Sequence, residues 1–214
     1  MSFDSLGLSA ELLRSIKDQG YTQATSIQEK AIPAALQGKD LMASAQTGTG
    51  KTAAFTLPML QKIAAQAGGG RRHIKALVLA PTRELAAQVE DSVRTYGRHL
   101  KLRSLSVCGG VGIGPQIRQM NSGVDILVAT PGRLMDHMER GTVDLSGVET
   151  LILDEADRML DMGFLPAIEK IVKTLPRSRQ TLLFSATFSA PIQKLAHKFM
   201  NNPEMIETAA RNSA

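Results

Sequence analysis

The sequence has no tryptophan and only one cysteine, and aromatic residues make up just 4% of its 214 residues. Because Cys108 has no second cysteine to pair with, an internal disulfide is excluded, which fits a protein of the reducing cytoplasm. No apolar run approaches the roughly 18 residues that a membrane-spanning helix needs. The N-terminus also lacks the basic and apolar segments of a signal peptide. We therefore expect a cytoplasmic protein, without a membrane partner, whose core is aliphatic.

A strong excess of one charge sign is also missing. Lysine and arginine number 25 against 20 acidic residues, which gives a net charge of +5 and a pI of about 9.5. This balance favours acidic partners such as nucleic acid only mildly. The basic residues between positions 94 and 103 are more typical of a solvated helix face than of an RNA-binding patch.

What the sequence does contain is a regular alternation of short apolar runs and helical patterns. The expected strands are 40–45, 74–80, 102–107, 125–130, 149–154, 181–186 and 204–208. The expected helices are 9–19, 26–37, 50–66 with a kink at Pro58, 83–98, 114–121, 131–139, 162–174 and 189–200. This alternation predicts a single α/β domain over residues 1–214, with a mostly parallel sheet of about seven strands and helices on both faces.

Polar or glycine-rich motifs follow six of these strands in turn. In chain order they read AQTGTGKT, PTREL, GG, TPGR, DEAD and SAT. Because ligands of open parallel sheets bind outside the carboxyl ends of the strands, we expect these motifs to meet at one edge of the sheet.

The first motif has the features of a phosphate-binding loop. Gly48 and Gly50 let the backbone approach a phosphate, and the helix that follows directs its free N–H groups to the same place. Lys51 would reach the β- and γ-phosphates, and the Thr52 hydroxyl would ligate Mg²⁺. A plain helix start with an exposed lysine is the alternative, and the strand–loop–helix context favours nucleotide binding.

The fifth motif places carboxylates at the end of an apolar strand. Asp154 is suited to hold Mg²⁺ through water, and Glu155 is suited to orient and deprotonate the attacking water. The alternative is a charged turn in which Asp157 caps the next helix. The phosphate loop upstream favours the catalytic interpretation.

Together the six motifs resemble those of the DEAD-box ATP-dependent RNA helicases, over essentially the whole chain. The segments LDEADRMLDMGF and LLFSATFS look most similar to the bacterial RhlE-type subgroup. The resemblance implies a RecA-like P-loop domain that binds ATP–Mg²⁺ and the backbone of single-stranded RNA. The implied phosphate loop comprises Ala45, Gln46, Thr47, Gly48, Thr49, Gly50, Lys51 and Thr52, with Ala45 standing where the stricter pattern has glycine.

The resemblance also implies that residues 1–29 form an adenine-recognition segment. Gln28 would hydrogen-bond the adenine edge, Tyr21 would pack on its face, and Phe3 matches an isolated upstream aromatic of the same segment. The family usually has proline where this chain has Ala24 and Ser26. Without the other motifs, Gln28 would be taken as a solvent-facing residue that opens a helix.

RNA-backbone contacts are implied for three of the motifs. Their residues are Pro81, Thr82, Arg83 and Glu84, then Gly109 and Gly110, then Thr130, Pro131, Gly132 and Arg133. Helix N-termini and glycine turns do offer N–H groups to phosphates, although each motif alone could equally be a helix cap. Ser185 and Thr187 would hydrogen-bond Asp157 and so couple the nucleotide site to the RNA site.

In the resembled family a second RecA-like domain follows and supplies the arginine fingers. None of its motifs occurs in these residues, so we expect the chain alone to bind nucleotide, hydrolyse it poorly and not unwind duplex RNA. Two other interpretations remain at this point. One is a DNA-directed translocase of the wider superfamily, and the other is a non-catalytic, ATP-gated RNA clamp.

Overall fold

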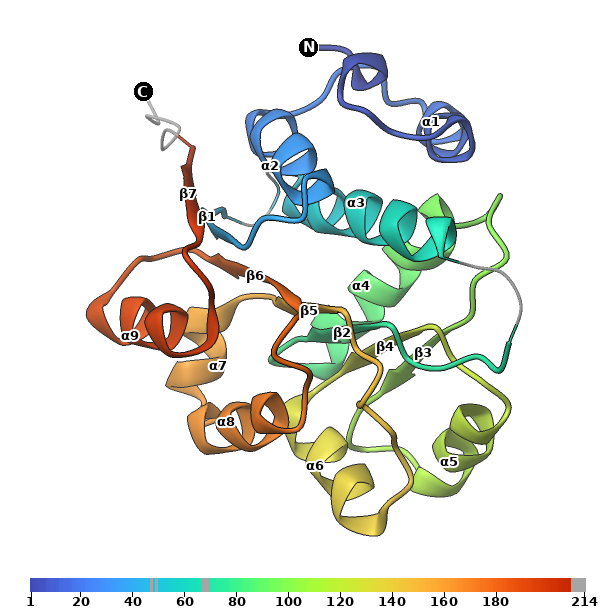
Figure 1. The fold of residues 1–214 in the computed structure, drawn as a ribbon, viewed down its shortest axis with the longest axis vertical. Helices are drawn as coiled ribbons and strands as arrows, with labels where there is room; N and C mark the ends of the chain where they lie inside the picture. Colours follow the sequence, from blue (N-terminus) through green and yellow to red (C-terminus); the bar gives the residue numbers. More distant parts are fainter. Residues whose placement is uncertain (47, 49, 67–69, 209–214) are drawn as a thin grey trace.

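The computed structural model describes residues 1–46, 48, 50–66 and 70–208. At its centre is a seven-stranded sheet in the order β3-β4-β2-β5-β6-β1-β7, in which all paired strands are parallel (Figure 1). The strands are β1 Leu41–Ser44, β2 Ala76–Leu79, β3 Ser104–Val107, β4 Ile126–Ala129, β5 Thr150–Leu153, β6 Gln180–Ser185 and β7 Glu204–Glu207. The predicted α/β fold with a seven-stranded parallel sheet is confirmed.

Helices cover both faces of this sheet. They are α1 Ala10–Asp18, α2 Ser26–Leu36, α3 Lys51–Ala65, α4 Arg83–Tyr96, α5 Ile113–Asn121, α6 Pro131–Arg140, α7 Ala156–Asp161, α8 Leu165–Lys173 and α9 Ala190–Phe199, with a short 3₁₀ helix at Phe3–Ser5. One buried cluster joins α1 to α4 with one face of the sheet, and a second joins α6 to α9 with the other. The fold therefore has two cores, one on each side of the sheet.

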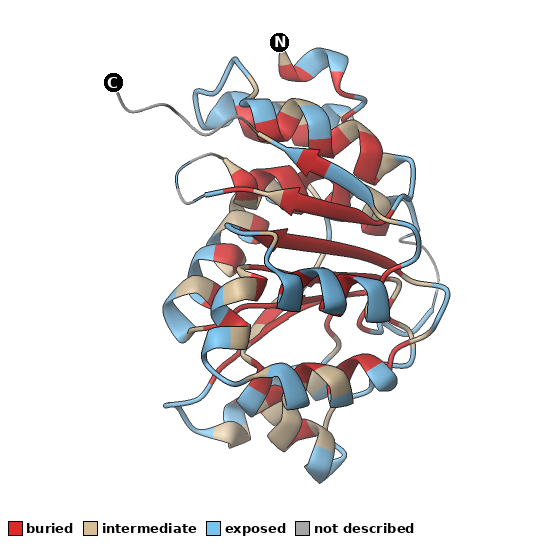
Figure 2. Cartoon of the chain, turned by 90° about the vertical axis from the view of Figure 1, so that its left-hand side faces the viewer, coloured by how far each residue is buried: buried red, intermediate tan, exposed pale blue. Residues whose placement is uncertain are grey.

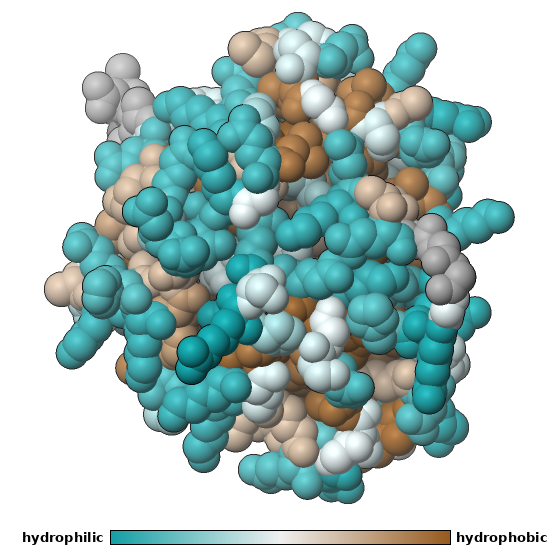
Figure 3. All heavy atoms as spheres, viewed as in Figure 1, coloured by the Kyte–Doolittle hydropathy of each residue, from teal (hydrophilic) through white to brown (hydrophobic). Residues whose placement is uncertain are grey.

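The central strands are covered by helices on both faces. In β2, Ala76 and Val78 belong to the first cluster, whereas Leu77 and Leu79 belong to the second. This alternation follows from the two-residue period of a strand, and burial on both faces explains why β2 is apolar throughout. Figure 2 shows buried strands between helices with exposed outer faces, and Figure 3 shows a mostly hydrophilic surface on the face that it presents.

One helical prediction needs correction. The helix expected over 162–174 begins only at Leu165, and a separate helix, α7, precedes it directly after the acidic motif. Asp157 accordingly lies in the first turn of α7, and the residue at the N-cap position is Glu155. The helix expected over 50–66 is confirmed as α3, Lys51–Ala65, which contains Pro58. None of the helices in the described ranges is long and apolar enough to cross a membrane.

Candidate functional site

The phosphate loop joins the carboxyl end of β1 to the N-terminus of α3. Ala45 is buried, and its N–H donates to the Ser185 carbonyl at 3.1 Å, which ties the start of the loop to the end of β6. A small side chain is therefore accommodated where the stricter pattern has glycine. Gln46 and Gly48 are exposed, whereas Thr47 and Thr49 lie outside the described residues.

Gly50 has a backbone conformation that explains its glycine. Its φ is +83°, in the left-handed region, and it occupies the N-cap position of α3. A Cβ at this position would lie 2.5 Å from Gln28 Nε2 and 2.9 Å from Thr25 Oγ1. The loop and the predicted adenine segment are thus packed directly against each other.

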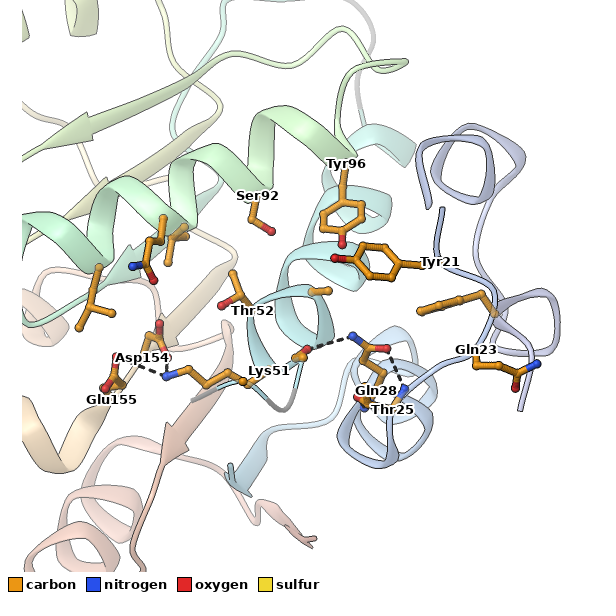
Figure 4. Close-up of a pocket in the computed structure, with 17 residues that line it drawn as sticks. Tyr21, Gln23, Thr25, Gln28, Lys51, Thr52, Ser92, Tyr96, Asp154 and Glu155 are labelled. Atoms are coloured by element: carbon orange, nitrogen blue, oxygen red, sulfur yellow. Dashed lines mark hydrogen bonds and ion pairs between the residues drawn. The ribbon is translucent and has the colours of Figure 1, made fainter. Parts of the chain in front are cut away.

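Lys51 reaches the acidic motif from the first residue of α3 (Figure 4). Its Nζ lies 2.9 Å from Asp154 Oδ1 and 3.4 Å from Glu155 Oε2, and both Lys51 and Asp154 are buried. Burial raises the pKa of the Asp154 carboxyl above its usual value, and the Lys51 ammonium opposes that rise only in part. Glu155 has φ +51°, an unusual conformation for a residue with a side chain, and such strain is concentrated at functional sites.

These carboxylates provide the chemistry that a hard cation requires. Apart from the Lys51 ammonium, neither Asp154 Oδ1 nor Glu155 Oε2 has a hydrogen-bond partner among the described residues. Nowhere in the described residues do three or more histidine, cysteine, aspartate or glutamate side chains form a group that could hold a metal ion. A cation here would need further ligands from phosphates and water, which is how Mg²⁺ is commonly bound. Thr52 lines the same cavity and is half-buried.

The cavity beside the loop has a volume of about 440 Å³, and residues of the predicted adenine segment form part of its lining. Gln28 is 6% exposed and forms a capping box with Thr25, because its Oε1 accepts the Thr25 N–H at 2.9 Å. Its Nε2 donates to the Gly50 carbonyl at 3.1 Å. A glutamine amide has two lone pairs and two N–H groups, so one of each remains for a ligand.

The two predicted aromatics differ in exposure. Phe3 is 6% exposed and packs in the core, whereas Tyr21 is 57% exposed, and both line the cavity. The sequence interpretation missed the opposite wall, where Gln88, Ser92 and Tyr96 of α4 face the same space. Their four-residue spacing places them on one helix face, which is the signal that could have found them.

The predicted RNA-contacting residues come together in a second, open hollow. It is lined by Pro81, Thr82, Arg83, Gly109, Thr130, Gly132 and Arg133, together with Asp136, Met162 and Phe164. Glu84 and Gly110 are exposed, and Pro131 is buried at the first turn of α6.

The capping alternative holds for part of this set. Thr82 Oγ1 accepts the Leu85 N–H at 3.2 Å and caps α4, whereas Thr130, at the N-cap of α6, makes no side-chain cap bond. Helix capping therefore does not account for the presence of a hydroxyl side chain at Thr130.

The predicted coupling bonds are not formed in this structure. No hydrogen bond joins Asp157 to Ser185 or Thr187 among the described residues. Instead, Ser185 is buried and its Oγ accepts the Thr187 N–H at 3.4 Å, while Thr187 is exposed. Asp157 lies in the first turn of α7, which follows β5, whereas Ser185 is the last residue of β6 and Thr187 lies just beyond it; β5 and β6 are paired neighbours in the sheet.

Comparison with known proteins decides the family. A profile of the DEAD/DEAH box helicases matches residues 25–195, most of the chain. The chain belongs to this family. The ATP-dependent RNA helicase CshA of Listeria monocytogenes is 48% identical over 98% of the chain and 39% of its own length. The DEAD-box ATP-dependent RNA helicase CshA of Streptococcus pneumoniae is 50% identical over 99% of the chain and 40% of its own length.

The fold of the DEAD-box chain is also found in a solved structure. A DEAD box protein from the hyperthermophile Methanococcus jannaschii superposes with a TM-score of 0.92 at 40% identity, over 98% of this chain and 56% of that one. The chain therefore spans about two fifths of the curated relatives and just over half of the structural one. The finer assignment to the RhlE-type subgroup stays a prediction.

Proposed function

We propose that the chain is the ATP-binding half of an ATP-dependent RNA helicase. The observation that carries the proposal is the ion-paired group of Lys51, Asp154 and Glu155, beside a cavity that Gln28 also lines. That cavity combines a phosphate loop, an acidic strand end and an amide with one donor and one acceptor to spare. The relatives named as ATP-dependent RNA helicases support the same activity.

In the proposed reaction the ATP phosphates lie against the loop from Ala45 to Thr52. Lys51 leaves the carboxylates to contact the β- and γ-phosphates, and Glu155 accepts a proton from the attacking water. Asp154 and Thr52 would hold Mg²⁺, which neutralises charge on the phosphate oxygens when bound. Gln28 would read the adenine edge with its free N–H and its free lone pair, and Tyr21 would cover the ring.

The second hollow is proposed as half of an RNA-backbone site. Its N–H groups come from two helix N-termini and the Gly109–Gly110 turn, and Arg83 adds charge at the surface. Such contacts carry no base information, so binding is expected to depend on salt more than on sequence. Asp157, Ser185 and Thr187 are proposed to become bonded only in the ligand-bound state.

We further propose that hydrolysis and unwinding require a second RecA-like domain and take place in the cytoplasm. The RNA helicase names of the relatives favour RNA over the DNA-translocase alternative. The presence of both Lys51 and Glu155 beside the loop favours a hydrolase over a non-catalytic clamp, because the groups that this domain would supply to turnover are intact.

The proposal is tested by titrating the chain with Mg–ADP in a calorimeter. Lys51→Met keeps the length of the side chain but removes its charge, and we expect at least about a tenfold loss of affinity from the missing charge-assisted contact. Lys17→Ala, at an exposed lysine of α1, is the matched control and should bind as the wild type does. Failure of the wild-type chain to bind Mg–ADP would refute the nucleotide site.

A further inference from the structure

A buried polar side chain lies behind the second hollow and belongs to none of the six motifs. Gln116 is 6% exposed on helix α5, whose other polar residues are exposed. Its Nε2 donates to the Cys108 carbonyl at 3.1 Å. Its Oε1 accepts from Arg133 Nη1 at 3.2 Å and from His137 Nε2 at 2.8 Å. The amide thus joins α5, α6 and the turn after β3.

These bonds fix the Gly109–Gly110 turn from both sides. Gln116 holds the carbonyl of Cys108, which directly precedes the two glycines. Arg133 Nη1 donates at 2.9 Å to the carbonyl of Val111, which directly follows them. Because glycine places few restrictions on its own φ and ψ, this turn takes its shape from the groups that hold its ends.

The same amide also orients Arg133. The two N–H groups of its Nη1 are directed to Val111 and Gln116, which leaves Nη2 and Nε for a ligand. An arginine held in one rotamer loses less entropy when it binds a phosphate. If Arg133 contributed only its positive charge, it would not need a buried hydrogen-bond partner such as Gln116.

His137 completes this arrangement from the next turn of α6. Its side chain has no exposed surface, and its Nδ1 lies 2.8 Å from the Thr142 hydroxyl. Since Gln116 Oε1 can only accept, Nε2 must carry a proton, and the Thr142 hydroxyl beside Nδ1 also donates to the His137 carbonyl at 3.1 Å. Burial lowers the pKa of His137, with Arg133 contributing, so the neutral ring with a fixed tautomer is favoured.

We propose that Gln116, supported by His137, is a positioning residue for RNA-backbone binding: it holds the Gly109–Gly110 turn and Arg133 in the geometry that phosphates require. This inference rests on the proposed RNA site. It assigns a role in recognition to a side chain that does not itself touch the ligand. The alternative is that the network merely stabilises the packing of α5 on α6.

The experiment measures binding of a fluorescent single-stranded RNA to the chain by anisotropy, over a series of salt concentrations. Gln116→Leu removes the amide at similar volume, and Gln119→Leu changes an exposed glutamine of the same helix. We expect about a tenfold loss of RNA affinity for Gln116→Leu alone, as for a lost hydrogen bond to a charged group. Affinity for Mg–ADP should not change in either variant.

The salt dependence separates positioning from packing. If Arg133 no longer meets a phosphate, the slope of log K against log salt should become shallower by about 0.7, the value per phosphate contact of a single strand. A variant that is only less stable would bind with fewer active molecules but with an unchanged slope. If Gln116→Leu binds RNA with the same affinity and the same salt slope as the wild type, the inference is overturned and the proposed function still stands. A wild-type chain that does not bind RNA would overturn both.

A second pair of variants decides the matter if Gln116→Leu does not fold. His137→Gln retains an N–H donor of similar reach toward Gln116, whereas His137→Leu removes it. We expect His137→Gln to keep RNA affinity within about twofold and His137→Leu to lose several-fold, with the same flattening of the salt slope. Equal RNA affinities and slopes for these two variants would contradict the positioning role.

Discussion

Substituting Gly50 by alanine tests whether the adenine segment and the phosphate loop form one unit. Two costs are expected. A left-handed φ of +83° costs an alanine about 1–2 kcal/mol relative to glycine. The new Cβ would also lie 2.5 Å from Gln28 Nε2, so the Gln28 amide must move and release the Gly50 carbonyl. The Gly50 carbonyl keeps the Ala54 N–H at 3.1 Å, but leaving the buried Gln28 amide without this partner costs about 1–3 kcal/mol more.

Gly38 supplies the matched control for this substitution. It has the same φ of +83°, but a Cβ there meets no described atom within 4 Å. Gly38→Ala should therefore show the backbone cost alone. Urea unfolding of both variants should give a free energy of unfolding about 1–3 kcal/mol lower for Gly50→Ala than for Gly38→Ala.

The same variants can be compared in nucleotide binding. If Gln28 reads adenine from the position that Gly50 gives it, Gly50→Ala should also weaken Mg–ADP binding, whereas Gly38→Ala should not. Equal unfolding free energies for the two variants would show that Gln28 and the loop are not mechanically linked.

Three further expectations follow from the site. In a chain that carries the second domain, Glu155→Gln should retain ATP binding but lose turnover by roughly 10²–10⁴-fold, and near-normal turnover would place the base elsewhere. Fluorescent ADP should bind about tenfold more tightly than GDP, because a guanine edge cannot match the free donor and acceptor of Gln28, and equal affinities would remove Gln28 from this role. The lowered pKa of His137 means that the unfolded chain binds a proton more readily than the folded one, so its contribution to stability is lost as pH falls below about 6.5. Urea unfolding from pH 7.5 to 5 should show this loss in the wild type, at up to about 1.4 kcal/mol per pH unit, and a shallower loss in His137→Gln, whereas parallel curves would contradict it.

The sequence predicted the strands well because most are short apolar runs bounded by turn residues, although β7, Glu204–Glu207, buries only Ile206. Burial on both faces produces an unbroken run such as ALVL in β2, which periodicity alone identifies once strand length is considered. The helix after the acidic motif was harder to predict from the sequence. LDMGF interrupts an otherwise helical pattern, and only the packing of Met159 into the second cluster shows that α7 precedes the break.

The residues of the site that belong to local sequence motifs were predictable. Lys51 and Asp154 were singled out from their motifs, and the parallel topology brings them within 2.9 Å. The hydrogen bonds of Gln116 were not predictable in the same way, because a glutamine on an amphipathic helix has no fixed partner in sequence. They depend on which loop or helix the fold places opposite the side chain.

We propose that residues 1–214 carry both ligand sites of a helicase and that a second domain supplies the element that links them. The direct measurement is the affinity for a non-hydrolysable ATP analogue, with and without saturating single-stranded RNA, at fixed salt. Linkage requires a two-state element that both ligands bias, and we assign that element to closure against a second domain. In residues 1–214, RNA should change ATP affinity by less than about threefold, rising to the usual 1–3 kcal/mol when the second domain is present. Strong linkage in residues 1–214 alone would place the switch inside this domain, at Asp157, Ser185 and Thr187, and would contradict the account.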